Sequence, residues 1–241
     1  MKLFLVDPGR SIHYENIFAC LASMDIPLEF ITFEDWRRNA ECDLVLTSCE
    51  FYDKSALILC EARSKGIPSL HIVDGALEWR NTWSNPRSES QDYGMPLMQP
   101  ILADKIACIG FAQARILSSW GGFDKVEITG LPRLDHLAVH KSTKSGSLTT
   151  TKRIRILIGT ANTPYFTKKD EVEVRDSIRD LNTQLSSVRG LLPQDVIWRV
   201  NSEILPCDNL FGVIDNRFHP LIDALCSADF FISTPSTSIL E

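Results

Sequence analysis

The sequence contains no excess of basic residues and no long apolar run. Lys and Arg number 25 against 31 Asp and Glu, which gives a formal charge of −6, whereas nucleic-acid binders usually carry a basic face. No apolar stretch approaches the length of a membrane-spanning helix, and the apolar start within MKLFLVDPGRS is too short for a signal peptide. We therefore expect a cytoplasmic protein with no nucleic-acid partner. Peripheral association with the inner face of the membrane stays open.

Motifs for metals and tightly bound cofactors are absent as well. The seven cysteines are scattered and none forms a CxxC pair, which excludes zinc-finger spacing. Several lie in apolar surroundings such as CLASM and IACIG, which favours buried, reduced thiols outside an oxidising compartment. No Asp-x-Asp motif follows an expected strand, and no Gly-Lys-Ser/Thr follows a glycine-rich loop. The sequence therefore predicts no metal and no cofactor.

Short apolar strands alternate with helices along the whole chain. In the first half, strands are expected at residues 2–6, 27–32, 43–47, 69–73, 105–109 and 125–129, and helices at 12–24, 55–65 and 112–120. In the second half, strands are expected at 153–158, 195–200 and 229–233, and helices at 168–188 and 220–227. This alternation predicts an α/β fold with parallel sheets and right-handed crossovers.

A polar stretch, HKSTKSGSLTTTK at residues 140–152, divides this pattern. It is rich in Ser, Thr and Lys and poor in apolar residues, which is the composition of a linker. We therefore predict an N-terminal domain over 1–139, a linker over 140–152 and a C-terminal domain over 153–241.

The loop after the expected strand 69–73 carries chemistry-bearing residues, because ligands in parallel sheets bind where strands end and helices begin. Asp74 before a glycine is a candidate general base, with backbone free to approach a substrate. Tryptophan faces bind sugar rings and arginine binds phosphate or carboxylate. The alternative is a plain Asp-Gly turn with packed tryptophans, although the long polar loop that follows favours function. The candidates in this loop are Asp74, Gly75, Glu78, Trp79 and Arg80.

Two further loops follow expected strands. GLPRLD offers Gly130, Arg133 and Asp135, which would line a cleft between the domains or form a plain turn with a surface ion pair. IGTANT offers backbone and side-chain donors to a phosphate, from Gly159, Thr160 and Asn162. His219, which precedes Pro220 at a helix start, would contact an anion or cap a turn.

The end of the chain, FFISTPSTSILE, joins an apolar strand to a hydroxyl-rich turn. Free amides and hydroxyls at the positive end of a helix suit a diphosphate, and Ser236 is a candidate N-cap. A glutamate further along could accept hydrogen bonds from ribose hydroxyls. The alternative is a serine-rich cap without a ligand. The candidates here are Thr234, Ser236, Thr237, Ser238 and Glu241.

Three of these stretches resemble GT-B-fold glycosyltransferases of bacterial surface polysaccharides, together with the related CDP-glycerol glycerophosphotransferases and UDP-N-acetylglucosamine 2-epimerases. GFAQARILSSWGGFDKVEITGLPRLDHL is similar to the last βα unit of their first domain. RIRILIGTANTPYF is similar to the first strand and loop of their second domain, and ADFFISTPSTSILE to their donor-binding strand and turn. The resemblance implies two Rossmann-like domains, with the acceptor side in the first and the nucleotide sugar in the second.

The resemblance implies transfer of a sugar from a UDP-, CMP- or CDP-linked donor to a saccharide or lipid-linked acceptor, as in capsule or lipopolysaccharide synthesis. Ser236, Thr237 and Ser238 would then hold the donor phosphates and Glu241 the ribose, while Gly159, Thr160 and Asn162 would face them across the cleft. Asp74 would deprotonate the acceptor. Two alternatives stay open: a sugar-nucleotide epimerase on the same scaffold, and a non-catalytic nucleotide-sugar-binding or assembly subunit.

Two departures from the family pattern affect these expectations. Many relatives have His-Gly where this chain has Asp74-Gly75, and some place His-Pro where this chain has Asn201-Ser202. An acidic residue before glycine together with a His-Pro pair also resembles bacterial sialyltransferases and Kdo transferases. Those enzymes use CMP-sugars, so the donor base stays open. The doubly wound plan also implies roughly two more βα units after Glu241, so the second domain is expected to be incomplete.

Overall fold

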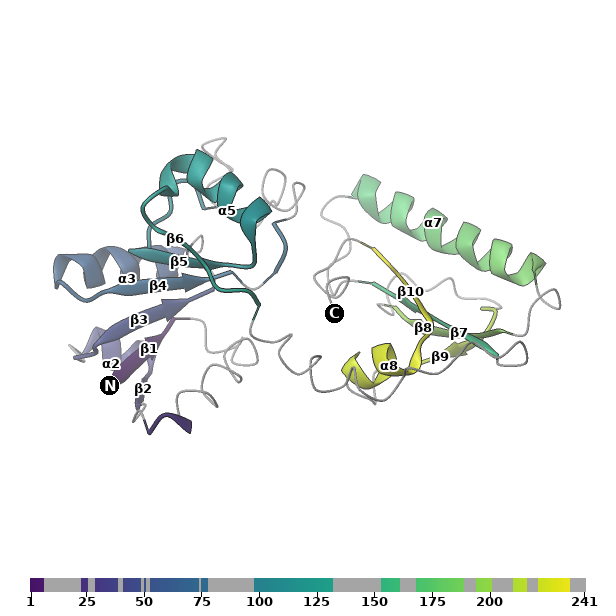
Figure 1. Cartoon of the computed structure of the whole chain (residues 1–241), viewed down its shortest axis with the longest axis horizontal. Coiled ribbons are helices and arrows are strands. Elements are labelled where there is room, and N and C mark those ends of the chain that lie inside the picture. The colour runs from purple at the N-terminus through teal and green to yellow at the C-terminus, as the bar shows by residue number, and fades with distance from the viewer. Residues whose placement is uncertain are drawn as a thin grey trace. The chain divides into compact units, whose positions relative to one another are not determined.

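The structure is a computed structural model that shows two compact units, Met1–His136 and Leu137–Glu241 (Figure 1). It describes residues 1–6, 23–25, 29–38, 41–48, 50, 53–73, 75–77, 98–131, 153–160, 168–188, 194–200, 210–215 and 221–234. The predicted linker, residues 140–152, and most of the predicted helix 12–24 lie outside the described residues.

A six-stranded parallel sheet forms the centre of the first unit, in the order β2-β1-β3-β4-β5-β6 (Figure 1). The strands are β1 (Lys2–Leu5), β2 (Glu29–Ile31), β3 (Leu44–Thr47), β4 (Ser69–Ile72), β5 (Lys105–Cys108) and β6 (Val126–Ile128). Leu3, Phe4, Val45 and Ile106 are fully buried. Strands of a parallel sheet are covered on both faces, which is why they read as continuous apolar runs.

Three helices of the first unit are described: α2 (Phe33–Arg37), α3 (Asp53–Ser64) and α5 (Phe111–Leu117). The sequence prediction missed α2, whose single turn is stabilised by a capping box between Thr32 and Asp35. The predicted helix over 112–120 corresponds to α5, which ends at Leu117, and to the π-helical turn over Ser118–Gly122 that follows it directly.

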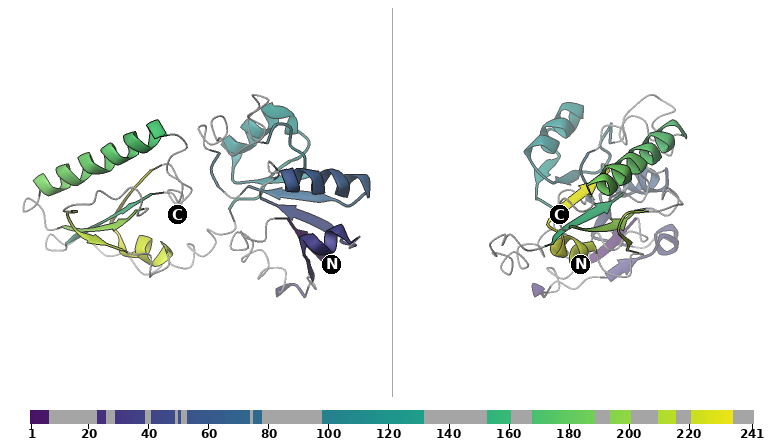
Figure 2. Two further views of the ribbon diagram at one scale, coloured as in Figure 1. Left: turned by 180° about the vertical axis from the view of Figure 1, so that it is seen from behind. Right: turned by 90° about the vertical axis from the view of Figure 1, so that its right-hand side faces the viewer.

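A four-stranded parallel sheet forms the second unit, in the order β10-β7-β8-β9. Its elements are β7 (Ile154–Gly159), α7 (Lys168–Ser187), β8 (Gln194–Arg199), β9 (Val213–Ile214), α8 (Leu221–Ser227) and β10 (Phe230–Ser233). Figures 1 and 2 show α7 over one face of this sheet and α8 over the other. Ile178 of α7 packs with Ile158, Val196 and Trp198 in one buried cluster. The sequence prediction missed β9, which has only two residues.

The predicted α/β fold with parallel sheets is confirmed, and the predicted strands and helices that the structure describes agree with it to within about three residues at their ends. The prediction for the thiols was partly wrong. Four described cysteines, Cys42, Cys60, Cys108 and Cys226, are free. Cys108 is buried as predicted, whereas Cys60 of α3 is exposed.

Gly212 holds β9 close to β8, and replacing it with alanine is expected to destabilise the second unit by about 2–3 kcal/mol. Its φ is +116°, and a Cβ would lie 2.3 Å from the carbonyl oxygen of Val196. Gly66 is a matched control, since its φ is +70° and a Cβ there would meet nothing within 4 Å. Gly66→Ala should therefore cost only the backbone strain, about 1 kcal/mol. Urea unfolding of both variants checks the difference, and equal losses would contradict the close approach.

Candidate functional site

The strand order of the second unit reverses between β7 and β10. From β7 the chain proceeds to β8 and β9 on one side, and β10 then pairs with the other side of β7. Open α/β sheets bind ligands beside such a switch point, at the carboxyl ends of the strands. There β7 ends at Gly159 and is followed by Thr160, and β10 ends at Ser233 and is followed by Thr234. The structure thus brings together three residues that the sequence predicted in separate loops: Gly159, Thr160 and Thr234.

Backbone hydrogen bonds align these strand ends. Ser233 pairs with Gly159 in register, and the amide of Thr234 donates to the carbonyl oxygen of Gly159 over 3.4 Å. On the other side of β7, the amide of Thr160 donates to the carbonyl oxygen of Arg199 over 3.3 Å. The Ser233 hydroxyl donates to the carbonyl oxygen of Thr234 over 2.8 Å. The carboxyl ends of the neighbouring strands β10, β7 and β8 therefore lie at the same level of the sheet.

Gly159 has a packing role at this edge. A Cβ there would lie 3.0 Å from Cε2 and 3.2 Å from Cζ of the Phe231 ring. These distances are shorter than ordinary van der Waals contacts, so the Phe231 ring lies directly against the glycine backbone. A larger residue at position 159 would push the Phe231 ring of β10 away from β7.

An ion pair that the sequence analysis missed lies at the same edge. Nη1 of Arg199 lies 3.1 Å from Oδ2 of Asp215, and both side chains are only 13% exposed. The amide of Asp215 donates to the carbonyl oxygen of Trp198 over 2.8 Å, which continues the β8–β9 ladder. Because successive strand residues point to opposite faces, Arg199 lies on the face opposite Trp198 and α7. Ser233, Gly159, Arg199 and Asp215 thus form one row across the carboxyl ends of the sheet.

In the first unit, two glycines that the sequence predicted as site residues, Gly75 and Gly130, follow strands that are not neighbours in the sheet. Gly75 follows β4 and Gly130 follows β6, with β5 between them. The Gly75 carbonyl oxygen accepts a hydrogen bond from Nε2 of Gln113 over 3.0 Å, and Oε1 of Gln113 accepts one from the amide of Ile109 over 2.8 Å. Gln113 is buried and thereby joins the ends of β4 and β5. The sequence analysis missed it, because a glutamine within a helix carries no signal.

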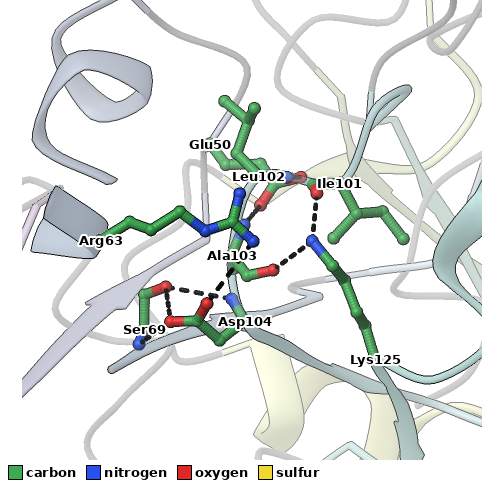
Figure 3. A network of polar contacts seen from close by, with 8 residues as sticks. All are labelled: Glu50, Arg63, Ser69, Ile101, Leu102, Ala103, Asp104 and Lys125. Carbon is green, nitrogen blue, oxygen red and sulfur yellow. Dashed lines mark hydrogen bonds and ion pairs between the residues drawn. The ribbon is translucent and has the colours of Figure 1, made fainter. Parts of the chain in front are cut away.

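A polar network holds the segment that leads into β5 (Figure 3). The carboxylate of Glu50 accepts hydrogen bonds from the amides of Leu102 over 3.2 Å and Ala103 over 3.1 Å. The ammonium group of Lys125 donates to the carbonyl oxygens of Ile101 over 2.7 Å and Ala103 over 2.9 Å. Glu50, which precedes α3, and Lys125, which precedes β6, therefore hold this segment together, and with it the start of β5.

The adjacent residue of the segment is anchored to β4. The Asp104 carboxylate accepts hydrogen bonds from the amide of Ser69 over 2.9 Å and from its hydroxyl over 2.8 Å. Arg63 of α3 approaches the same carboxylate at 3.8 Å, and its side chain is 63% exposed. The bonds to Ser69 therefore carry most of this anchoring, since exposed ion pairs contribute little.

Glu50 also lies beside His71 in the interior of the first unit. Nδ1 of His71 is 3.2 Å from Oε2 of Glu50, and the two side chains are 0% and 1% exposed. This is an ion-pair distance without hydrogen-bond alignment, and neither ring nitrogen of His71 has an aligned partner in the described part of the chain. Burial acts to raise the pKa of Glu50. The His71 ring and the amides of Ala103 and Leu102 outweigh burial, so the pKa of Glu50 lies below its usual value.

The remaining predicted site residues lie outside the described residues: Asp74, Glu78, Trp79, Arg80, Arg133, Asp135, Asn162, His219, Ser236, Thr237, Ser238 and Glu241. Their roles stay predictions. The described residues contain no group of three or more His, Cys, Asp or Glu side chains that could hold a metal ion. None of the described helices is both long enough and apolar enough to cross a membrane.

Comparison with known proteins finds similarity in structure alone. No protein-family model and no curated protein matches the chain. The whole chain superposes on 75% of MnaA from S. aureus, solved with UDP, at a TM-score of 0.57 and 12% identity. It also superposes on 78% of a UDP-GlcNAc 2-epimerase from Neisseria meningitidis bound to UDP-GlcNAc, at a TM-score of 0.58 and 15% identity. At these identities the likeness shows the fold, which is α/β with two Rossmann-like parallel sheets of the GT-B type.

Proposed function

We propose that this protein is an enzyme that binds a nucleotide sugar at the carboxyl ends of β7 and β10. One observation carries the proposal: Gly159 and Thr160 meet Ser233 and Thr234 at the switch point of the second sheet. Amides and hydroxyls at such an edge suit phosphate oxygens. Both solved neighbours contain a uridine nucleotide, which supports UDP as the first ligand to test.

For the reaction, we propose transfer of the sugar to a saccharide or lipid-linked acceptor. Asp74 deprotonates the acceptor hydroxyl, and the turn around Ser236 stabilises the departing phosphate. This assignment is supported by the resemblance of three sequence stretches to surface-polysaccharide glycosyltransferases.

A second candidate reaction is epimerisation of the free nucleotide sugar. It is favoured by the solved neighbour from Neisseria meningitidis, which is a UDP-GlcNAc 2-epimerase. Incubation with UDP-GlcNAc alone, followed by NMR, separates the two reactions. An epimerase forms an isomer without any acceptor, whereas a transferase leaves the sugar nucleotide intact or hydrolyses it slowly. Binding without either product would indicate a non-catalytic subunit.

We expect the double variant Ser236→Ala, Thr237→Ala to bind UDP about a hundredfold more weakly than the wild type. Each hydroxyl is proposed to donate to a charged phosphate oxygen, and such a bond is worth roughly 1.5–3 kcal/mol, or about tenfold or more in affinity. Isothermal titration with UDP, CDP and CMP measures the loss and identifies the preferred base.

Ser186→Ala is a matched control for this experiment. Ser186 is exposed on α7, and its hydroxyl donates to the carbonyl oxygen of Asn182 over 2.7 Å. Its loss should leave nucleotide affinity unchanged. If the wild-type protein binds none of the three nucleotides, the proposed function is wrong. If the folded double variant binds as tightly as the wild type, the nucleotide binds elsewhere.

A further inference from the structure

We propose that Arg199, oriented by Asp215, is the cation that binds the phosphate groups of the nucleotide. The inference rests on the proposed function and adds a residue pair to it. Neither residue was a candidate in the sequence analysis. The pair is assigned from its place in the row across the carboxyl ends of β10, β7, β8 and β9.

The location of Arg199 matches that of the proposed phosphate site. It is the last residue of β8 and pairs in register with Gly159 of β7, which itself pairs with Ser233 of β10. Among the described residues at the carboxyl ends of the second unit's strands, Arg199 is the only Lys or Arg. Arg153 lies at the opposite end of β7, where its guanidinium is 3.2 Å from Asp195.

Four other described cations of the second unit, Lys168, Lys169, Arg175 and Arg179, lie on α7. On α7, Lys168 and Arg175 both pair with Glu171, at 2.7 Å and 3.0 Å. Arg179 pairs with Asp176 of the same helix at 2.6 Å. Pairs between residues three or four apart stabilise the helix surface itself. None of the four lies on a strand, whereas Arg199 is the last residue of β8.

The burial of the Arg199–Asp215 pair also points to a role in binding. Removing two charges from water costs free energy that their attraction barely recovers, so a buried pair is weak evidence for stability. Both side chains are 13% exposed, yet the pair lies at the end of a strand, where polar side chains could remain in water. A binding site explains this placement, because a partly dehydrated cation attracts an anion more strongly than a hydrated one does.

Asp215 acts as a positioning residue in this arrangement. Its carboxylate contacts Nη1 of Arg199, and its amide is bonded to the carbonyl oxygen of Trp198. The guanidinium is planar, so a contact at one nitrogen restricts the orientation of the whole group. A planar guanidinium can bind two phosphate oxygens at once, which an ammonium group cannot do with the same geometry.

The test compares a nucleotide with its nucleoside. In Arg199→Gln we expect the affinity for UDP to fall by about 10- to 150-fold, the range for hydrogen bonds to charged groups. The affinity for uridine, which has no phosphate, should change by less than about threefold. CMP and cytidine are measured as a second pair, so that the result does not depend on the base. NMR titration reaches the weak affinities expected for the nucleosides.

The outcomes separate this inference from the proposed function. If the wild type binds UDP and Arg199→Gln binds it equally well, the inference is wrong and the proposed function stands. A parallel loss of UDP and uridine binding would assign the pair a purely structural role and also overturn the inference. If Arg199→Gln does not fold, Arg199→Lys takes its place, with a smaller loss for UDP alone. Failure of both variants to fold would likewise show a structural role. A wild type that binds neither nucleotide removes the proposed function itself.

Discussion

Glu50→Gln is expected to destabilise the first unit by about 1–3 kcal/mol or more, the cost of leaving a buried hydrogen-bonding group without its partner. The carboxylate is 1% exposed and accepts hydrogen bonds from the amides of Leu102 and Ala103. A glutamine keeps the size, but its NH₂ group would face one of these amides. It would also leave His71 without the carboxylate that lies 3.2 Å from its ring.

Urea unfolding at neutral pH measures this loss, and hydrogen exchange at the amides of Leu102 and Ala103 locates it. Arg63→Ala is the control from the same network, because Arg63 is 63% exposed and 3.8 Å from Asp104 (Figure 3). Its loss should cost less than about 0.5 kcal/mol. A similar small cost for Glu50→Gln would show that the buried carboxylate does not hold the segment before β5.

The stabilisation by Glu50 should depend on pH in a defined direction. The pKa of Glu50 lies below its usual value in the folded protein, so the folded state favours the charged carboxylate. Its contribution is then fully present above the unfolded pKa, about 4.3, and is lost as the pH falls through the lower folded pKa. The difference in unfolding free energy between wild type and Glu50→Gln should therefore shrink as the pH falls below about 4.

Asp74→Asn is expected to lower the turnover rate by about 10²- to 10⁴-fold, the typical contribution of a positioned general base. Asparagine keeps the size and most hydrogen bonds of the side chain but cannot accept a proton. The backbone is anchored on both sides of Asp74. The amide of Val73 donates to the carbonyl oxygen of Ala107 over 3.0 Å, and the Gly75 carbonyl oxygen is held by Gln113.

Initial rates at saturating nucleotide sugar measure the effect of Asp74→Asn, and UDP affinity should stay the same. Asp176→Asn on the exposed side of α7 controls for loss of a carboxylate as such. A loss below about threefold, with an unchanged thermal melt, is far short of the expected range. It would remove Asp74 as the base and direct attention to Glu78 in the same loop.

Much of the fold could be predicted from the sequence, because its signals are local. The apolar runs that became β1 and β7 are short and bounded by turn residues. The core-facing residues of α7 recur at helical spacing, at Val174, Ile178, Leu181 and Leu185. Elements with weak local signals were missed. The single turn of α2 depends on the capping box of Thr32 and Asp35, and β9 is a strand only because it pairs with β8.

Part of the candidate site could be predicted for the same reason. Gly159, Thr160 and Thr234 lie where apolar strands end, and a parallel sheet places the carboxyl ends of all its strands at one edge. Their adjacency could not be predicted, because it depends on the strand order. β10 is last in the chain but pairs with β7, the first strand of its sheet.

The sequence by itself determined the α/β class of the protein, the positions of most strands and helices, and the polar residues that follow β7 and β10. Only the tertiary structure decided which distant residues meet: Arg199 with Asp215, Gln113 with Gly75, and Glu50 with His71, Leu102 and Ala103. Glu50 and Ala103, for example, are 53 residues apart. Alternation along a strand gives the face on which a side chain lies. Its partner depends on strand order and register, which are properties of the folded sheet.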